Sequence, residues 1–315
     1  MLYRILVSLL SLKMRMENKM AVKISAEAVK NLREQTGAGM MECKNALVQA
    51  EGDVAKAEDI IAKMGHRKAA KSASRTAKEG LIAIKTASDN HKGVLVEINC
   101  ETDFVARDES FKAFVEAVGR VALETGQDSV EALLQNPIDG YDSIEDARKA
   151  LIAKIGENIQ IRRMRHLRAD QNESIGAYLH GNRIGVLVKM KGGDVSLSRD
   201  VAMHIAAMSP QFIAPKDVSA DVIAKEKEIL VARAKESGKP DNIIEKIVQG
   251  QLNKYLNDIC LLGQPFVKDQ DISVENYLKT NKATLLDFVR FAVGEGIQVT
   301  KMSFQEEVMA QARGK

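Results

Sequence analysis

The sequence contains no tryptophan, and aromatic residues make up only 4% of its 315 positions. Proteins that bind single-stranded nucleic acid stack the bases on aromatic side chains, so this composition argues against that class of protein. Lys and Arg outnumber Asp and Glu by only 46 to 43, whereas proteins that bind duplex DNA usually carry a clear basic excess. We therefore expect no direct, sequence-specific contact with nucleic acid.

Cysteine is scarce as well. The three cysteines, Cys43, Cys100 and Cys260, lie far apart and form no CxxC pair. Their odd number and wide spacing argue against a disulfide framework and against a structural zinc site. A chain of this kind suits a reducing compartment, and we expect a cytoplasmic protein.

The common motifs of enzymes are also missing. The sequence has no phosphate-binding P-loop, no dinucleotide-binding glycine motif, no HExxH and no GxSxG, and its five histidines lack the spacing of metal ligands. An enzyme that uses Cys100 or a histidine is one alternative, but the carboxylates of Glu101 and Asp103 beside Cys100 disfavour its thiolate form. We expect no catalytic residue, no cofactor and no metal site.

The first 19 residues contain an apolar run, Ile5 to Leu12, with Arg4 before it. The run is shorter than the ~20 apolar residues that span a bilayer. Lys13 to Glu17 occupies the place where a signal peptide would have its small-residue cleavage site. Because Met20 to Lys23 is typical of a protein start, residues 1–19 are interpreted as a disordered extension from an upstream start codon, without membrane association.

Three short helices are predicted between Ile24 and Met64, and they would form a small bundle. Ser25 and Asp53 are favoured N-cap residues, while Gly37 and Gly52 are typical of helix ends. The predicted helices end at Thr36, run from about Met40 to Ala50, and run from Val54 to Lys63. Two interpretations remain for Met40 and Met41: both fill the core, or one of them is an exposed, adaptable contact for a partner.

A basic stretch follows, from His66 to Lys78. It contains five Lys or Arg residues and no acidic residue: Arg67, Lys68, Lys71, Arg75 and Lys78. Such a stretch is typical of a solvated linker. A contact with RNA is the alternative, and it makes an RNA- or ribosome-binding module the second functional hypothesis.

The middle of the chain contains an internal repeat. The tetrapeptide Gly-Val-Leu-Val occurs at 93–96 and again at 185–188. Each copy lies in the second strand of a predicted strand–turn–strand unit, and an apolar helix follows each unit. The expected strands are 81–86, 93–100, 158–167, 176–180 and 184–190. The expected helices begin at 108, 130 and 144, and a further apolar helix contains residues 201–208. This pattern indicates a duplicated α+β core with antiparallel sheets.

The last third of the chain is predicted to be mostly helical. Ser219 is an N-cap for a charged helix from Ala220 to Ser237, and a second helix runs from Asp241 to about Leu256. The Gly-Lys-Pro turn between them predicts an antiparallel helical hairpin, which can project and self-associate. A further strand is expected at 284–293 and a terminal helix at 304–312.

The segment Thr102-Asp103-Phe104 directly follows a predicted strand and precedes a helix. In one interpretation Thr102 or Asp103 caps that helix and Phe104 enters the core. In the other, the segment is a loop that presents an acid and an aromatic anchor to a partner, because binding energy concentrates in such anchors.

Several long motifs resemble one known family. They are residues 97–107 (EINCETDFVAR), 32–44 (LREQTGAGMMECK), 154–159 (KIGENI), 180–186 (HGNRIGV) and 263–267 (GQPFV). Together, and in this order, they resemble the signatures of the bacterial elongation factor Ts family. The resemblance covers the chain from Met20 to about its C-terminus, and only residues 1–19 depart from it.

The resemblance implies an α+β fold with several parts. They are an extension (1–19), a ubiquitin-associated-like three-helix domain (20–65), a basic linker (66–79), an N-terminal core subdomain (80–174), a C-terminal core subdomain (175–212 and 263–298), a dimerising helical hairpin or coiled coil (213–262) and a short C-terminal helical module (299–315). A homodimer or a 2:2 complex with the partner is the implied assembly.

The resemblance also implies a function, guanine-nucleotide exchange on elongation factor Tu without covalent chemistry. The loop matching Thr102 to Val105 would wedge into this GTPase beside its Mg²⁺ and phosphate site. Phe104 would be the wedge, and Asp103 would disturb Mg²⁺ coordination. The partner-binding residues implied by the family are Met40, Met41 and Lys44 in the N-terminal bundle, and Ile155, Gly156 and His180 in the core; the C-terminal helix would add a contact.

Overall fold

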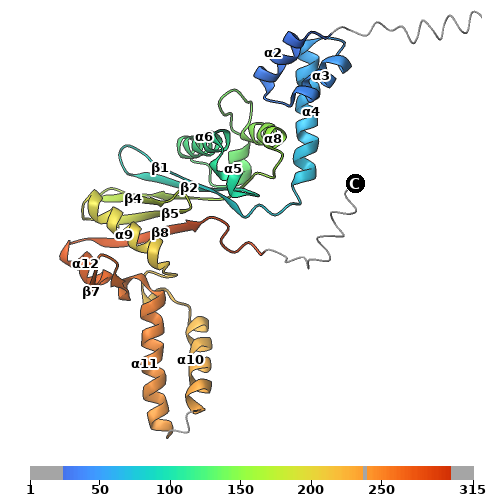
Figure 1. Ribbon diagram of the computed structural model, residues 1–315. Coiled ribbons are helices and arrows are strands. Elements are labelled where there is room, and N and C mark those ends of the chain that lie inside the picture. Colours follow the sequence, from blue (N-terminus) through green and yellow to red (C-terminus); the bar gives the residue numbers. More distant parts are fainter. Residues whose placement is uncertain (1–23, 237–239, 299–315) are drawn as a thin grey trace, which may run out of the picture. The chain divides into compact units, whose positions relative to one another are not determined.

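The computed structural model describes residues 24–236 and 240–298 (Figure 1). These residues form two compact units. Unit 1 contains the described residues up to Ser74 together with 149–157, and unit 2 contains 75–148 and the described residues from Asn158 onward. The predicted extension at 1–19 and the predicted terminal helix at 304–312 lie outside the described residues.

Unit 1 is built on three helices, α2 (Ala26–Thr36), α3 (Met40–Gln49) and α4 (Val54–Ser72). The hydroxyl of Ser25 accepts a hydrogen bond from the amide of Ala28, and the carboxylate of Asp53 accepts one from Lys56, as expected of N-caps. Gly37 ends α2 in the left-handed conformation, with φ of 66°. The buried core consists mainly of Leu32, Cys43, Ala46, Leu47 and Ala57.

Helix α4 is longer than predicted. It continues beyond Lys63 through the first half of the basic stretch and ends at Ser72. A Cβ at Gly65 would lie 3.2 Å from the Cβ of Ala153, so this glycine allows close helix packing and does not end the helix. The ammonium group of Lys68 pairs with Glu42 and donates to the carbonyl of Ala153 at 3.4 Å. Tertiary contacts therefore stabilise a helical segment that its sequence alone indicates only weakly.

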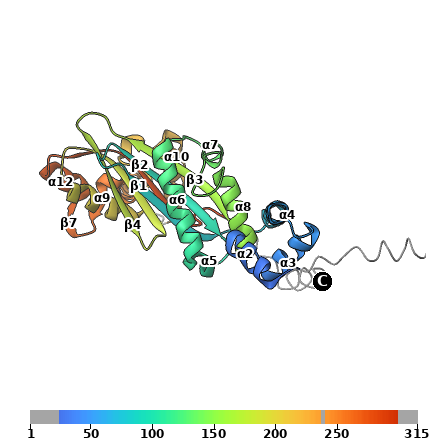
Figure 2. The same cartoon turned by 90° about the horizontal axis from the view of Figure 1, so that it is seen from above.

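Unit 2 contains two three-stranded antiparallel sheets. The first has the order β1 (Glu79–Thr86), β2 (Lys92–Cys100) and β3 (Gln160–Arg168). The second has the order β4 (Glu173–His180), β5 (Ile184–Lys191) and β8 (Thr284–Ala292). Helix α6 (Glu109–Thr125) packs on β1 and β2, and α9 (Val195–Met208) packs on β4 and β5 (Figures 1 and 2). The α+β class with antiparallel sheets is thus confirmed, and the strand–turn–strand–helix unit occurs twice.

The remaining elements connect or extend these layers. They are α5 (Asp103–Arg107), α7 (Val130–Leu134), α8 (Ile144–Ile155), the 3₁₀ turns η1 (Pro215–Asp217) and η2 (Leu261–Gly263), the hairpin helices α10 (Ala220–Lys235) and α11 (Asp241–Ile259), the short strands β6 (Pro265–Phe266) and β7 (Asp269–Ser273), and α12 (Val274–Thr280). The helical hairpin has a core of its own around Leu230, Ile244 and Val248.

The sequence reasoning missed α5, α12 and the β6–β7 pair. Within the described ranges, no helix is long and apolar enough to cross a membrane.

The two sheets pack face to face, and the repeated tetrapeptide lies at their contact. In the second copy Val186 and Val188 point toward α9, whereas Leu187 points toward the first sheet, as the alternation of a strand requires. A Cβ at Gly93 would lie 3.0 Å from Cδ2 of Leu187, and a Cβ at Gly185 would lie 2.7 Å from Cδ2 of Leu95. The leucine of each copy therefore fills the space that the glycine of the other copy leaves open.

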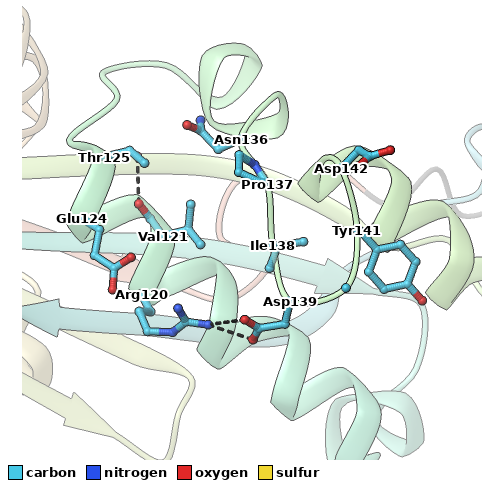
Figure 3. Close-up of a pocket in the computed structure, with 11 residues that line it drawn as sticks. Arg120, Val121, Glu124, Thr125, Asn136, Pro137, Ile138, Asp139, Tyr141 and Asp142 are labelled. Carbon is cyan, nitrogen blue, oxygen red and sulfur yellow. Dashed lines mark hydrogen bonds and ion pairs between the residues drawn. The ribbon is translucent and has the colours of Figure 1, made fainter.

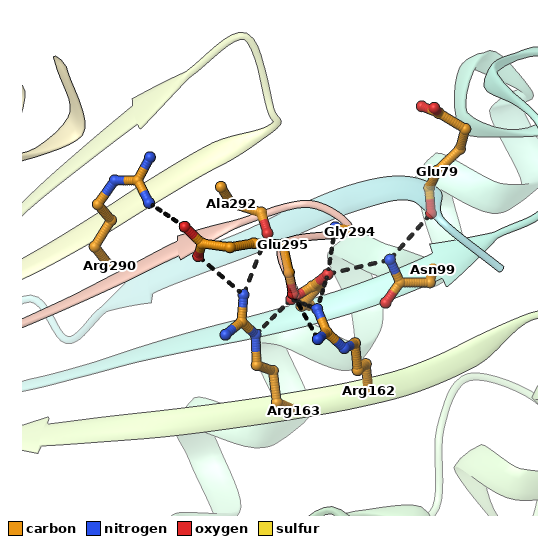
Figure 4. Close-up of polar contacts among 9 residues, drawn as sticks. Glu79, Asn99, Arg162, Arg163, Arg290, Ala292, Gly294 and Glu295 are labelled. Carbon is orange, nitrogen blue, oxygen red and sulfur yellow. Dashed lines mark hydrogen bonds and ion pairs between the residues drawn. The ribbon is translucent and has the colours of Figure 1, made fainter. Parts of the chain in front are cut away.

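A buried carboxylate joins the same two sheets at the end of their contact (Figure 4). Glu97 of β2 is fully buried. It accepts hydrogen bonds from Arg162 at 3.0 Å, Arg163 at 2.5 Å and Asn99 at 3.1 Å, all on the first sheet. It also accepts one at 2.8 Å from the backbone amide of Gly294, which follows β8 of the second sheet.

The two arginines extend this cluster, which we call the Glu97 clamp. Arg162 donates to the carbonyl of Glu295 at 2.6 Å, and Arg163 donates to the carbonyl of Ala292 at 3.2 Å. The guanidinium carbon of Arg163 also lies 4.2 Å from the ring centroid of Phe291. Burial opposes the ionisation of Glu97, but the hydrogen bonds from Gly294, Arg163 and Asn99 outweigh it and hold the pKa of Glu97 below its ordinary value.

The packing of the sheets predicts that Gly185→Ala is destabilising. The new methyl group would meet the branched side chain of Ile82 at 2.6 Å, so we expect the free energy of unfolding to fall by about 1–3 kcal/mol. Gly250→Ala in α11 is the matched control, because its Cβ meets nothing within 4 Å and alanine favours a helix. Urea denaturation of the three proteins measures both effects. A Gly185→Ala protein as stable as the wild type would contradict this account of the repeat.

The Glu97 clamp predicts a pH-dependent loss of stability. Glu97→Gln should lower the free energy of unfolding by about 3 kcal/mol at pH 7, because it leaves two arginines without their buried charge partner. The depressed pKa means that the contribution of Glu97 is complete above its ordinary pKa of 4.5 and is lost as the pH falls through the folded-state value. Urea denaturation at several pH values should therefore show the two proteins converging in acid. A difference that stays constant down to pH ~3 would contradict the pKa assignment.

Candidate functional site

The segment that follows β2 presents an aromatic side chain to solvent. Thr102 is the N-cap of α5, and its hydroxyl accepts a hydrogen bond from the amide of Val105 at 3.4 Å. Val105 and Ala106 point inward and are buried, whereas Phe104 is 80% exposed. Thr102 thus caps α5, a helix that was not predicted, whereas Asp108 caps the predicted helix α6. The interpretation in which Phe104 enters the core is wrong. An exposed phenylalanine on an anchored helix is available to a partner.

Asp103 lies beside this phenylalanine on the first turn of α5. Its carboxylate accepts a hydrogen bond from Arg107 at 2.8 Å, one turn further along the helix. The side chain of Asp103 is 45% exposed, so its charge is only partly neutralised and is accessible from outside. Asp103 and Phe104 thus place a negative charge and an apolar ring next to each other on one short helix.

The base of this segment is held by buried contacts. The thiol of Cys100 donates to the carbonyl of Thr102 at 3.2 Å, and Cys100 itself is fully buried. Its position indicates a structural role in the turn from β2 into α5. Glu97, three residues earlier, is held by the clamp described above, so β2 approaches α5 with little freedom to move.

Helix α3 in unit 1 carries a second exposed apolar surface. Met40 is 58% exposed, Met41 is 63% exposed and Val48 is 53% exposed, and Lys44 is also exposed between them. The opposite side of the helix carries the buried residues Cys43, Ala46 and Leu47. The interpretation in which both methionines fill the core is therefore wrong. We call Met40, Met41, Lys44 and Val48 the α3 surface.

The other predicted contact residues lie apart in the chain. Ile155, half-buried, ends α8, and Gly156 follows it with φ of 88°, a conformation that favours glycine. Both belong to unit 1, as does the α3 surface, whereas His180 and the segment from Thr102 to Val105 belong to unit 2. His180 is exposed at the end of β4, and its ring stacks on Tyr178 with 6.3 Å between the centroids.

His180 lines a mostly apolar cavity of about 440 Å³. The other lining residues are Tyr178, Ile184, Met203, Ala206, Ala207, Val267 and Lys268. Sequence reasoning gave no role to these residues, although the 263–267 motif that contains Val267 was a visible signal. The residues that line the cavity combine apolar side chains with the hydroxyl of Tyr178, an imidazole and an ammonium group.

A buried histidine fixes one wall of this cavity. His204 of α9 is fully buried, and its Nδ1 accepts a hydrogen bond from the amide of Val267 at 3.1 Å. Its Nε2 lies 3.0 Å from Oε1 of Gln264, so Nε2 carries the proton of a neutral ring. Burial lowers the pKa of His204, against the opposing effect of the Gln264 bond. The ring therefore stays neutral and positions Val267.

Another cavity, of about 520 Å³, lies between α6 and residues 136–142 (Figure 3). Arg120 spans its edge and binds both carboxylate oxygens of Asp139, at 2.9 and 2.8 Å. None of the predicted contact residues lines this cavity. In the parts of the chain that the structure describes, no group of three or more His, Cys, Asp or Glu side chains is arranged to hold a metal ion.

Comparison with known proteins gives one consistent result. A family profile described as elongation factor TS matches residues 101–295. Curated proteins named elongation factor Ts are similar over almost their whole length: that of Alkalilimnicola ehrlichii is 53% identical over 291 residues, which cover 92% of this chain and 99% of the relative. The protein of Halorhodospira halophila is 48% identical, and the match covers 93% of this chain and 99% of the relative. The protein of Francisella tularensis subsp. novicida is 50% identical, and the match covers 92% of this chain and 99% of the relative. The chain belongs to the elongation factor Ts family.

Proposed function

We propose that this protein is a guanine-nucleotide exchange factor for elongation factor Tu. Membership of the elongation factor Ts family supports this role. The observation that carries the mechanism is the 80% exposure of Phe104 on a short helix whose base is anchored by buried contacts. The protein acts by binding its partner and carries out no covalent chemistry.

The proposed mechanism inserts Phe104 into the GTPase beside its nucleotide site. Phe104 is the wedge, Thr102 and Val105 fix its helix, and Asp103 brings a negative charge toward the region where the GTPase holds Mg²⁺. Mg²⁺ is bound to nucleotides through phosphate oxygens and a small number of carboxylates. Displacing the ion removes a large part of the attraction between the GTPase and GDP, so GDP leaves.

Linkage explains why such a wedge releases nucleotide. If the factor binds the nucleotide-free GTPase more tightly than the GDP complex, GDP must bind more weakly to the factor complex by the same ratio. The factor therefore needs no preference for GTP. The nucleotide that is more abundant in the cell rebinds and displaces the factor.

Further contacts would hold the two proteins together. We propose that the α3 surface docks on the GTPase domain, with Met40 and Met41 as adaptable apolar contacts and Lys44 as a charge. Ile155 and Gly156 would add partner contacts of their own. In unit 2, His180 and the cavity it lines with Tyr178 and Val267 would receive an apolar part of the partner. Self-association through the α10–α11 hairpin, as a homodimer or a 2:2 complex, stays a prediction.

The RNA-binding alternative receives less support. Of the basic residues between His66 and Lys78, Lys68 pairs with Glu42 and Arg75 pairs with Glu101. Both cations thus have partners within the fold, and Lys68 lies inside α4. Two of the five cations of this stretch are thus used within the fold and are less available to bind phosphate groups.

Phe104→Ala should slow the release of GDP from elongation factor Tu. An anchor of this kind contributes roughly 2 kcal/mol or more to an interface, so we expect release at a fixed factor concentration to slow by ~30-fold. Fluorescent GDP bound to the GTPase reports the release rate. The stability of the variant should not change, because the lost ring is in contact with solvent.

Tyr141→Ala is the matched control for this experiment. Tyr141 is also an exposed aromatic residue of unit 2, at 45% exposure, and it lies outside every predicted contact. This variant should release GDP at the wild-type rate. If Phe104→Ala behaves in the same way as Tyr141→Ala, the assignment of the wedge is wrong.

Asp103→Ala should impair the displacement of Mg²⁺ more than it impairs docking. The variant should bind the nucleotide-free GTPase with nearly wild-type affinity, but its release rate at millimolar Mg²⁺ should fall by about 10-fold. When Mg²⁺ is removed with a chelator, the difference from the wild type should vanish, because there is no ion left to displace. A defect of the same size with and without Mg²⁺ would assign Asp103 to docking.

A further inference from the structure

Glu101 connects three segments of the chain directly behind the wedge. One of its carboxylate oxygens accepts a hydrogen bond from the backbone amide of Asn158 at 2.5 Å and lies 3.1 Å from Nε of Arg75. The side-chain amide of Asn158 donates to the carbonyl of Arg75 at 2.8 Å. Glu101, Arg75 and Asn158 thus form a closed set of contacts, the Glu101 clasp, and all three belong to unit 2.

The clasp lies at two of the points where the chain passes between the units. Arg75 directly follows Ser74, and Asn158 directly follows Glu157; these are the last residues of the two chain segments that make up unit 1. Thr102, the N-cap of α5, directly follows Glu101. One carboxylate therefore holds two of the three connections to unit 1 next to the base of the wedge; the third is the continuous helix α8, in which the chain crosses between Arg148 and Lys149.

The clasp differs from an ordinary surface ion pair. The side chain of Glu101 is only 19% exposed, and Asn158 is 4% exposed. A charged acceptor that binds a backbone amide and a guanidinium group makes stronger hydrogen bonds than neutral groups do. Exposed pairs, by contrast, contribute little, because water screens them. The clasp is thus a specific connection that a single substitution can release.

We propose that Glu101 is a positioning residue that couples docking of the α3 surface to insertion of Phe104. This inference rests on the proposed exchange function. Unit 1 carries the α3 surface and unit 2 carries the wedge, so one partner is contacted through two connected units. When two binding surfaces are joined, binding of the first brings the second close to the partner at a high effective concentration. A flexible joint lowers this effective concentration. By holding two of the three connecting segments, Glu101 keeps this joint stiff.

The first test measures the joint itself, in the full chain and without a partner. Spin labels are attached to Gln49→Cys in α3 and to Glu124→Cys in α6. Double electron–electron resonance spectroscopy then gives the distribution of distances between the two labels, one on each unit. Both sites are exposed, and the native cysteines are buried. Glu101→Ala should broaden this distribution, and Glu101→Gln, which keeps an acceptor for Asn158, should broaden it less.

Asp139→Asn is the matched control for the joint. It weakens the bond between Arg120 and Asp139, another arginine–carboxylate pair of unit 2 that holds no connection to unit 1. Its distance distribution should equal that of the wild type. If Glu101→Ala also leaves the distribution unchanged, the clasp does not stiffen the joint and the proposal is overturned.

The second test measures coupling during exchange. In the wild type, Met41→Ala should raise the factor concentration that gives half-maximal GDP release by about 10-fold. In the Glu101→Ala background the same change should raise it by less than about 3-fold, because docking then contributes less to insertion. Equal effects in the two backgrounds would show that Glu101 acts only on local structure, since independent sites are additive, and would overturn the coupling.

Failure of the exchange function itself would look different. In that case the wild-type protein would not accelerate GDP release at any concentration, and no coupling between variants could be observed. The distance distributions would still decide whether Glu101 controls the joint, because they require neither partner nor nucleotide. A broadened distribution would support the clasp, and an unchanged one would reject it.

Discussion

The face-to-face contact between the two three-stranded sheets is the constraint on which unit 2 depends. A two-stranded hairpin is only marginally stable alone, so each strand pair needs a third strand and a covered face. Gly93 and Gly185 let the sheets approach, and Leu95 and Leu187 fill the space between them. At the end of this contact Glu97 is buried as a charge, which is tolerated only because partners from both sheets surround it.

This constraint extends to the proposed wedge through β2. That strand is the middle one of its sheet, and it is buried along nearly all of its length. Contacts of Glu97, Asn99, Cys100 and Glu101 hold its last residues in turn. Phe104 is therefore exposed on a rigid support, and a rigid support loses little conformational entropy on binding. The exposure and the anchoring together suit a side chain that must enter another protein.

The two units divide the proposed work. The α3 surface belongs to a small helical unit whose core is held by a few buried residues, whereas the wedge and the His180 cavity belong to the larger unit with the two sheets. Docking and insertion are thus assigned to different parts of one chain. In the proposed mechanism, exchange depends on the connections between these parts as well as on the contact residues, and Glu101 lies at two of the three connections.

The sequence by itself determined most of the longer elements, the repeat and the family, because caps, periodicity and motifs are local properties. Ser25 and Asp53 cap the helices that they predict, and the Gly-Val-Leu-Val copies mark the two sheets. Only the tertiary structure decided that Phe104 is exposed, that α4 continues to Ser72 and that His180 borders a cavity with Val267. Each of these features depends on packing between residues that are far apart in the chain. The hydrogen bond from Gly294 to Glu97 is of the same kind. Local sequence patterns do not show which distant residues meet.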